Sequence, residues 1–124
     1  MSKKALIIVD HGSKVDEANI MLAQIAEQLN NKQDTEFDII SYCHMELAEP
    51  TIEQAFEDCV SKGATEIVVH PYFLAPGRHS TQDIPNMVIQ AAKNYPEISY
   101  VVTDPLGVHE KILEVILERA STKA

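Results

Sequence analysis

Short apolar segments alternate with segments of helical periodicity along this chain, and the alternation repeats four times. The spacing predicts β-strands over residues 5–9, 37–42, 66–70 and 98–103. The first of these is a continuous apolar run, which is typical of a strand buried on both faces of a sheet. The pattern therefore predicts a layered fold in which helices cover the sheet.

After each predicted strand, apolar residues recur at the spacing of an amphipathic helix, over residues 15–29, 52–60, 84–95 and 108–119. We expect Ser13 to cap the first helix, Pro50 to lie in the first turn of the second, and Gly63 to end it. Pro85 is compatible with a helix only in its first turn, so the third helix should begin near Asp83.

Four consecutive strand–helix units predict an α/β fold with a doubly wound, mostly parallel four-stranded sheet and helices on both faces. We expect the strand order 2-1-3-4 within one domain spanning residues 1–124. In this order the first and third strands are neighbours at the topological switch point. Such folds bind ligands there, beside the carboxyl ends of the strands, so the residues that follow these two strands form the candidate site.

A histidine follows each of these two strands. His11 lies in an Asp-His-Gly-Ser turn, and His79 closes the Pro/Gly-rich loop after the third strand. Imidazole is the commonest metal ligand and the usual proton carrier near neutral pH. Gly12 permits a tight turn, and Gly77 allows its loop to move or to adopt a positive φ. The alternatives are a structural turn histidine and an exposed loop histidine, but the fold favours one shared site.

Other polar residues near the predicted strand ends are weaker candidates. Glu46 follows the second strand and could accept protons or steer a metal ion, although a solvent-facing role is equally compatible with its position. We expect His44 to be incidental and His70 to be structural. His109 opens the last helix, where the helix dipole disfavours a cation, so it should be neutral and structural.

Composition and charge exclude several classes of function. A net charge of −9 argues against a nucleic-acid partner, which requires a basic face. The sequence contains neither a P-loop nor a G-x-G-x-x-G fingerprint, so we expect no bound nucleotide. No apolar run approaches the ~20 residues of a membrane span or resembles a signal peptide, which predicts a cytoplasmic protein without a membrane partner. Cys43 and Cys59 lack metal-site spacing and should be buried thiols.

Several motifs together resemble those of one enzyme family. They are Asp-His-Gly-Ser at residues 10–13, Glu-Leu-Ala-Glu-Pro at 46–50, and Pro-Tyr-Phe-Leu-Ala-Pro-Gly-Arg-His at 71–79 with Asp-Ile-Pro at 83–85. Pro-Leu-Gly-Val-His at 105–109 fits as well. On these residues the chain resembles the small, single-domain type of the sirohydrochlorin chelatase family, lyases that insert cobalt, iron or nickel into sirohydrochlorin.

The resemblance implies a set of roles. His11 and His79 match the family's metal-site histidines, and Glu46 matches its cleft glutamate. We further expect Ser13, Arg78 and Phe73 to contact the tetrapyrrole, with the loop over residues 72–78 covering the macrocycle. The metal is a substrate, with Co²⁺ the first expectation and Fe²⁺ or Ni²⁺ the alternatives. The product would serve cobalamin or sirohaem biosynthesis.

The resemblance also has an implication for assembly, and the sequence departs from the family pattern at certain points. Longer relatives contain two such domains with the tetrapyrrole between them, so this chain resembles one half and a homodimer is implied. Asp10 stands where relatives often have Gly, and it could contact metal, orient His11 or face solvent. The cysteine-rich extension of plant forms is absent, so no iron–sulfur cluster is expected.

Two other classes of function remain open at this point. A non-catalytic tetrapyrrole or metal carrier could use the same histidines. A phosphoryl-transfer domain could use a similar sheet, but the third strand ends in His-Pro rather than in an acceptor Asp.

Overall fold

The computed structural model describes residues 2–121, and every statement of structure below concerns this range. The four strands β1 (Lys4–Asp10), β2 (Ile39–His44), β3 (Glu66–Pro71) and β4 (Ser99–Val102) form one parallel sheet in the order β2-β1-β3-β4. The predicted fold class and strand order are confirmed. In register, Asp10 lies opposite His44 and Val9 lies opposite Pro71, so β2, β1 and β3 end at the same edge of the sheet.

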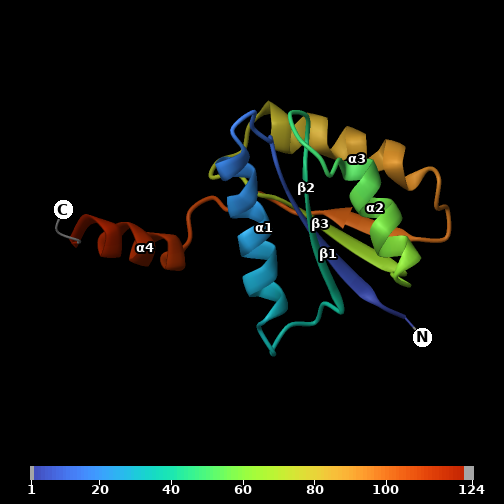
Figure 1. Ribbon diagram of the computed structural model, residues 1–124, viewed down its shortest axis with the longest axis horizontal. Coiled ribbons are helices and arrows are strands. Elements are labelled where there is room, and N and C mark those ends of the chain that lie inside the picture. Colours follow the sequence, from blue (N-terminus) through green and yellow to red (C-terminus); the bar gives the residue numbers. More distant parts are fainter. Residues whose placement is uncertain (1, 122–124) are drawn as a thin grey trace.

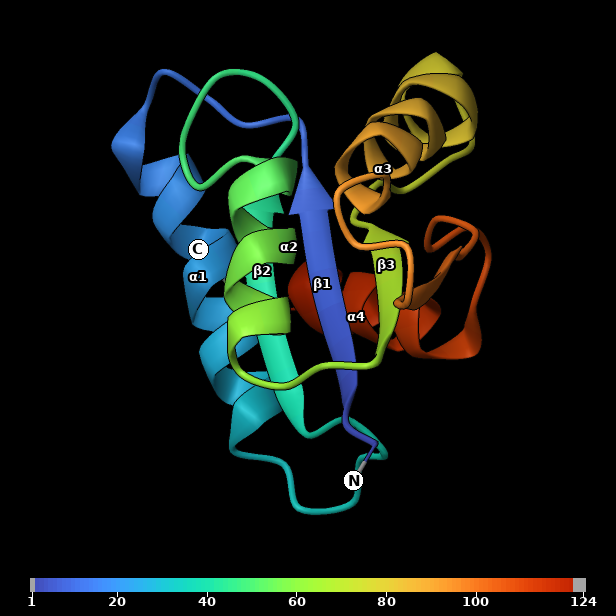
Figure 2. The same cartoon turned by 90° about the vertical axis from the view of Figure 1, so that its right-hand side faces the viewer.

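Helices lie on both faces of this sheet (Figures 1 and 2). Helix α1 (Asp16–Asn30) packs on one face, over β2 and β1, while α2 (Ile52–Ser61) and α3 (Ile84–Ala92) lie on the other. A π-helical turn, η1 (His79–Asp83), leads directly into α3. Helix α4 (Glu110–Ser121) extends away from the body of the molecule, beyond α1 (Figure 1).

The hydrophobic core divides into two parts because the sheet is covered on both faces. The larger part lies between the sheet and the helices α2 and α3, where Ile7, Val69 and Phe56 are fully buried. The smaller part lies under α1 and includes Ile8 and Leu22. Strand β1 therefore contributes side chains to both, which explains its continuous apolar run.

Two residues that were predicted at the starts of helices are placed differently in the structure. Helix α1 begins at Asp16 after Val15, and Ser13 Oγ instead accepts the N–H of Val15 in a turn before the helix. Pro50 precedes the cap of α2, because Thr51 occupies that position and forms a reciprocal capping box with Gln54. Those two predictions were wrong.

The remaining boundary predictions agree better with the structure. Gly63 follows α2 with φ of +98°, the left-handed conformation that ends a helix. Pro85 lies in the first turn of α3, which begins at Ile84. The described residues contain no helix that is both long and apolar enough to cross a membrane.

Both cysteines are free and buried, as predicted. Burial raises the pKa of the Cys59 thiol to about 11 and raises the pKa of Cys43 further. The two thiols therefore stay protonated near neutral pH and act as small apolar side chains.

Candidate functional site

His11 leaves the carboxyl end of β1 in a turn that only a glycine accommodates well. Gly12 has φ of +88°, and a Cβ at this position would lie 3.0 Å from the Cβ of His44 and 3.2 Å from the backbone N of Leu47. The carbonyl of His11 accepts the N–H of Glu46 at 3.1 Å. The turn thus brings the segment after β1 against the segment after β2, with the His11 side chain about one-third exposed.

His79 lies beside His11 but follows β3, the neighbour of β1 on the side away from β2. It opens the π-helical turn η1, and its ring centroid lies 4.9 Å from that of His11. The ring of Phe73 stacks on that of His79 with the ring centroids 6.4 Å apart. The carboxylate of Asp83 accepts a hydrogen bond from Nδ1 at 2.9 Å, which places the proton on Nδ1 and leaves Nε2 free to accept a metal ion.

Asp83 is a partner of His79 that the sequence did not predict. Its sequence context predicts only the Asp-Ile-Pro motif and the start of a helix. The signal was its spacing of four residues from His79, which places the two side chains on one face of a helical turn.

Glu46 completes the group at this edge of the sheet. Its Oε2 lies 2.8 Å from His11 Nε2, and the carboxylate is about half exposed. A shallow hollow of about 330 Å³ lies beside it, lined by Met45, Glu46, Asp83, Asn86 and Met87. Glu46 therefore faces both the histidine pair and an open space next to it.

Chemically, this cluster offers two partly exposed imidazoles and one carboxylate from the ends of three adjacent strands. Such a set is compatible with the borderline metals Fe²⁺, Co²⁺ and Ni²⁺, and it leaves coordination positions open. Within residues 2–121, no three His, Cys, Asp or Glu side chains are already arranged to enclose an ion. The arrangement suits transient contact with a metal or transfer of protons.

The comparisons with known proteins agree with this geometry. The model of the CbiX family matches residues 5–123. The chain belongs to the CbiX family. It is 47% identical over 114 residues to the chloroplastic sirohydrochlorin ferrochelatase of Arabidopsis thaliana, covering 92% of this chain and 50% of that protein. It is 30% identical over 141 residues to the sirohydrochlorin cobaltochelatase of Methanocaldococcus jannaschii, covering 94% and 97% of the respective chains.

A solved structure confirms the fold of this CbiX-family chain. The sirohydrochlorin chelatase SirB from Bacillus subtilis subspecies spizizenii, in complex with cobalt, superposes with a TM-score of 0.87 at 35% identity. The match covers 95% of this chain and 50% of SirB. The chain therefore spans about half the length of SirB and of the Arabidopsis relative, but nearly the whole of the archaeal one.

The predicted tetrapyrrole-binding residues are not all in one place. Phe73 lies against His79, and Arg78 immediately precedes it in an exposed, helical conformation. Ser13 lies around the Gly12 turn and lines a separate hollow of about 560 Å³ with Lys14 and Glu49. Gly77 has no positive φ, so that part of the expectation for its loop was wrong.

The remaining histidines have structural partners. His44 is the last residue of β2, only 1% exposed and bonded to Asp10. His70 pairs with the hydroxyl of Thr103 at 3.0 Å. His109 accepts the N–H of Lys111 on Nδ1 at the start of α4, which requires that nitrogen to be unprotonated.

Removal of the Asp83 carboxylate should weaken the site without removing a ligand. We expect Asp83→Ala to lower metal affinity and turnover by about 10- to 100-fold, because His79 loses the bond that fixes its tautomer and ring orientation. Isothermal titration with Co²⁺ and a steady-state assay measure the two effects. Gln82→Ala, a neighbouring exposed position on η1, is the control. An Asp83 variant as active as this control would contradict the role.

The partly buried His70 should make stability depend on pH. Burial lowers its pKa below the ordinary 6.5, with an opposing contribution from a backbone hydrogen bond at Asp104. The unfolded chain then binds more protons than the folded one, so stability falls as the pH drops below about 6.5. We expect a smaller loss of Tm between about pH 7 and about pH 5 in His70→Gln than in the wild type or in His109→Gln. Parallel curves for all three would contradict this.

Proposed function

We propose that this chain inserts a divalent metal ion into sirohydrochlorin and releases two pyrrole protons. The observation that carries the proposal is the convergence of His11, His79 and Glu46 at one edge of the sheet. Membership of the CbiX family and the names of its relatives supply the substrate. The chain is one chelatase-like domain, equivalent to one half of a longer relative.

In the proposed reaction, the metal is a substrate that the site must hold loosely and hand on. His79 presents Nε2 because Asp83 occupies Nδ1. His11 Nε2 points at Glu46, so a metal that binds this nitrogen displaces the proton shared between them. Two imidazoles leave positions open for water and then for the ring nitrogens of the macrocycle. Four metal–nitrogen bonds to the macrocycle form as two N–H bonds break.

Glu46 is the proposed acceptor for the pyrrole protons. It lies within hydrogen-bond distance of a metal-site histidine and is open to solvent, so it can pass protons to water. Its second proposed role is to position the ion, because a carboxylate beside two imidazoles is a third ligand. Loss of the proton acceptor would lower kcat, whereas loss of the positioning contact would raise KM for the metal.

The tetrapyrrole is proposed to lie beneath the loop over residues 72–78. Phe73 supplies an aromatic face next to His79, and Arg78 supplies a cation for the carboxylates on the macrocycle rim. The contact from Ser13 would be made on the far side of the Gly12 turn, at a different carboxylate of the same rim.

We propose Co²⁺ as the physiological metal. The archaeal relative of matching length is named a cobaltochelatase, and SirB has been solved with cobalt. The Arabidopsis relative is named a ferrochelatase, and SirB from Bacillus subtilis has also been solved with Fe³⁺, so Fe²⁺ is the principal competitor. Nitrogen and oxygen ligands do not select between these ions by affinity alone.

An anaerobic absorbance assay tests the proposed function. Purified protein is mixed with sirohydrochlorin and, separately, with Co²⁺, Fe²⁺ or Ni²⁺, against protein-free controls. The proposal predicts faster conversion to the metallated spectrum, with Co²⁺ the fastest. Binding of the tetrapyrrole without acceleration for any metal would contradict it and indicate a carrier.

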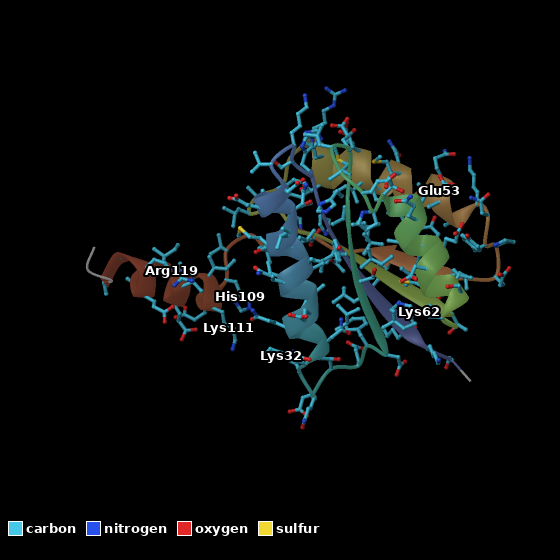
Figure 3. All side chains as sticks on the ribbon, viewed as in Figure 1. Lys32, Glu53, Lys62, His109, Lys111 and Arg119 are labelled. Atoms are coloured by element: carbon cyan, nitrogen blue, oxygen red, sulfur yellow. The ribbon has the colours of Figure 1, made fainter. Side chains whose placement is uncertain are left out.

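We further propose that two copies form the functional unit, and α4 supports this. Within the described chain, none of the residues of α4 is buried, and Leu113, Ile116 and Leu117 are 44%, 56% and 67% exposed. The outer part of α4, where Arg119 is labelled, stands clear of the molecule (Figure 3). On the edge strand β4, Val101 is also half exposed. The length of the longer relatives, about twice this chain, supports a second copy as the proposed partner.

Lysine substitutions on the apolar face of α4 should therefore produce monomers. Burial of a large aliphatic side chain is worth about 1.5–3 kcal/mol, so Ile116→Lys/Leu117→Lys should weaken association by roughly 10²-fold or more. Sedimentation velocity measures the change, with Glu114→Lys, which makes the same change of net charge on the same helix without removing an apolar side chain, as the control. A wild type that is monomeric at all concentrations would contradict the homodimer.

A further inference from the structure

Asp10 and His44 form a polar pair that the proposed reaction does not use. They are the last residues of β1 and β2 and lie directly opposite each other in the parallel register. His44 Nδ1 lies 2.6 Å from Asp10 Oδ1. The His44 side chain is 1% exposed and that of Asp10 is 24% exposed. The pair therefore lies beneath the surface on which His11 and Glu46 are displayed.

Burial of this polar pair costs the folded state free energy. The carboxylate requires a proton on Nδ1, and Nε2 of His44 has no hydrogen-bond partner within the described residues. Cys43 and Met45, the chain neighbours of His44, are buried apolar side chains. Buried polar pairs are often matched or exceeded in stability by apolar side chains of similar volume. Stability alone therefore does not account for the pair.

The pair lies where the segments that carry His11 and Glu46 leave the sheet. Beyond it, the N–H of Met45 donates to the carbonyl of Asp10 at 2.7 Å, and the N–H of Glu46 donates to that of His11 at 3.1 Å. Contact between the two segments thus continues past the strand ends. Asp10 immediately precedes His11 and His44 is two residues before Glu46, so the side-chain bond holds these segments in register.

His44 also supports the turn that follows His11. A Cβ added at Gly12 would lie 3.0 Å from the Cβ of His44, so the turn passes close to this side chain. The ring centroids of His44 and Tyr42 lie 5.8 Å apart in a T-shaped arrangement, and this contact further restricts the His44 ring. A shift of His44 would therefore move the turn and His11 with it.

We propose that Asp10 and His44 are positioning residues that set the distance of 2.8 Å between His11 Nε2 and Glu46 Oε2. Neither contacts the metal or the tetrapyrrole in this role. The inference rests on the proposed function only for its kinetic consequence. The predicted effect on the separation of His11 Nε2 and Glu46 Oε2 does not depend on the reaction.

The test uses a variant that removes the pair without leaving an unpaired buried group. Asp10→Ala/His44→Leu replaces both partners with apolar side chains, and Asp10→Asn keeps an acceptor for Nδ1. His70→Leu is the control, because it removes another partly buried histidine hydrogen bond at a neighbouring strand. The measurements are Tm, the Kd for Co²⁺ without tetrapyrrole, kcat and KM for insertion, and a crystal structure of the double variant.

The double variant should remain folded with a Tm close to that of the wild type, while the affinity for Co²⁺ falls by about tenfold and kcat/KM by about 10- to 100-fold. Its crystal structure should show the His11–Glu46 contact broken. Asp10→Asn should retain most of the wild-type affinity for Co²⁺, and His70→Leu should leave that affinity unchanged. This pattern separates positioning from a general loss of stability.

A folded double variant that keeps both the atom separation and the affinity for Co²⁺ would overturn the inference. If the wild type bound Co²⁺ but inserted none, the proposed function would fail, whereas affinity and geometry would still decide the role of the pair. If the wild type did not bind Co²⁺ at all, the structure of the double variant alone would decide it.

Discussion

His79→Ala is expected to abolish metal insertion while the protein stays folded. The side chain is about half exposed and contributes little to the core, so its loss should change Tm by only a few degrees. Removal of a residue beside a ligand typically costs about 10- to 100-fold, so removal of the ligand itself should cost at least about 100-fold in kcat/KM. Steady-state absorbance with Co²⁺ measures the loss, and circular dichroism verifies the fold.

The control for His79→Ala is Gln82→Ala, which truncates an exposed side chain on the same π-helical turn. It should retain the rate of the wild type. Retained insertion in a folded His79→Ala protein would remove His79 from the metal site. Equal losses in both variants would instead indicate that η1 tolerates no substitution.

Glu46→Gln should have the second largest effect. The amide keeps the size of the side chain and can still accept a hydrogen bond from His11, but it cannot take up a proton. If Glu46 accepts the pyrrole protons, kcat should fall by roughly 10²–10⁴-fold while KM for the metal changes little. A rise in KM at constant kcat would assign Glu46 to positioning the ion.

The matched control is Glu53→Gln, an exposed glutamate in the first turn of α2 (Figure 3). Both variants lose one negative charge, so a general change in the field of this acidic protein would affect them alike. A Glu46→Gln protein as fast as Glu53→Gln would contradict a chemical role for Glu46.

The sheet could be predicted because its strands are distinctive in sequence. A buried parallel strand such as β1 leaves a continuous apolar run, and the Gly and Pro residues at helix ends mark several boundaries. The least accurate strand was β2, which begins two residues later than predicted and continues to His44. Its start is displaced because Asp38 instead binds Lys4, accepting its N–H on the side chain and donating to its carbonyl.

The errors elsewhere share a physical cause, which is competition between equally suitable local partners. Ser13 has the chemistry of a helix cap, but Asn19 binds it through both side-chain atoms and holds it outside the helix. The apolar stripe of α4 predicted a helix correctly, but a stripe does not specify which surface covers it. Only the arrangement in space shows that none of the residues of α4 is buried within the described chain.

The site was predictable to the extent that the fold determines it. The strand order brings His11 and His79 together, and this prediction needed only the rule that ligands bind at switch points. The partners of these histidines were not predictable in the same way. Asp83 contacts His79 through a π-helical turn, and Asp10 reaches His44 across two strands, so both contacts depend on local geometry.

The measurement that tests the central claim most directly is an anomalous difference map from crystals soaked anaerobically with Co²⁺, collected at the cobalt edge. The account predicts one strong peak at coordination distance, about 2.0–2.2 Å, from imidazole nitrogens of both His11 and His79, with Glu46 beside it. A peak elsewhere on the protein, with this histidine pair vacant at saturating Co²⁺, would contradict the account.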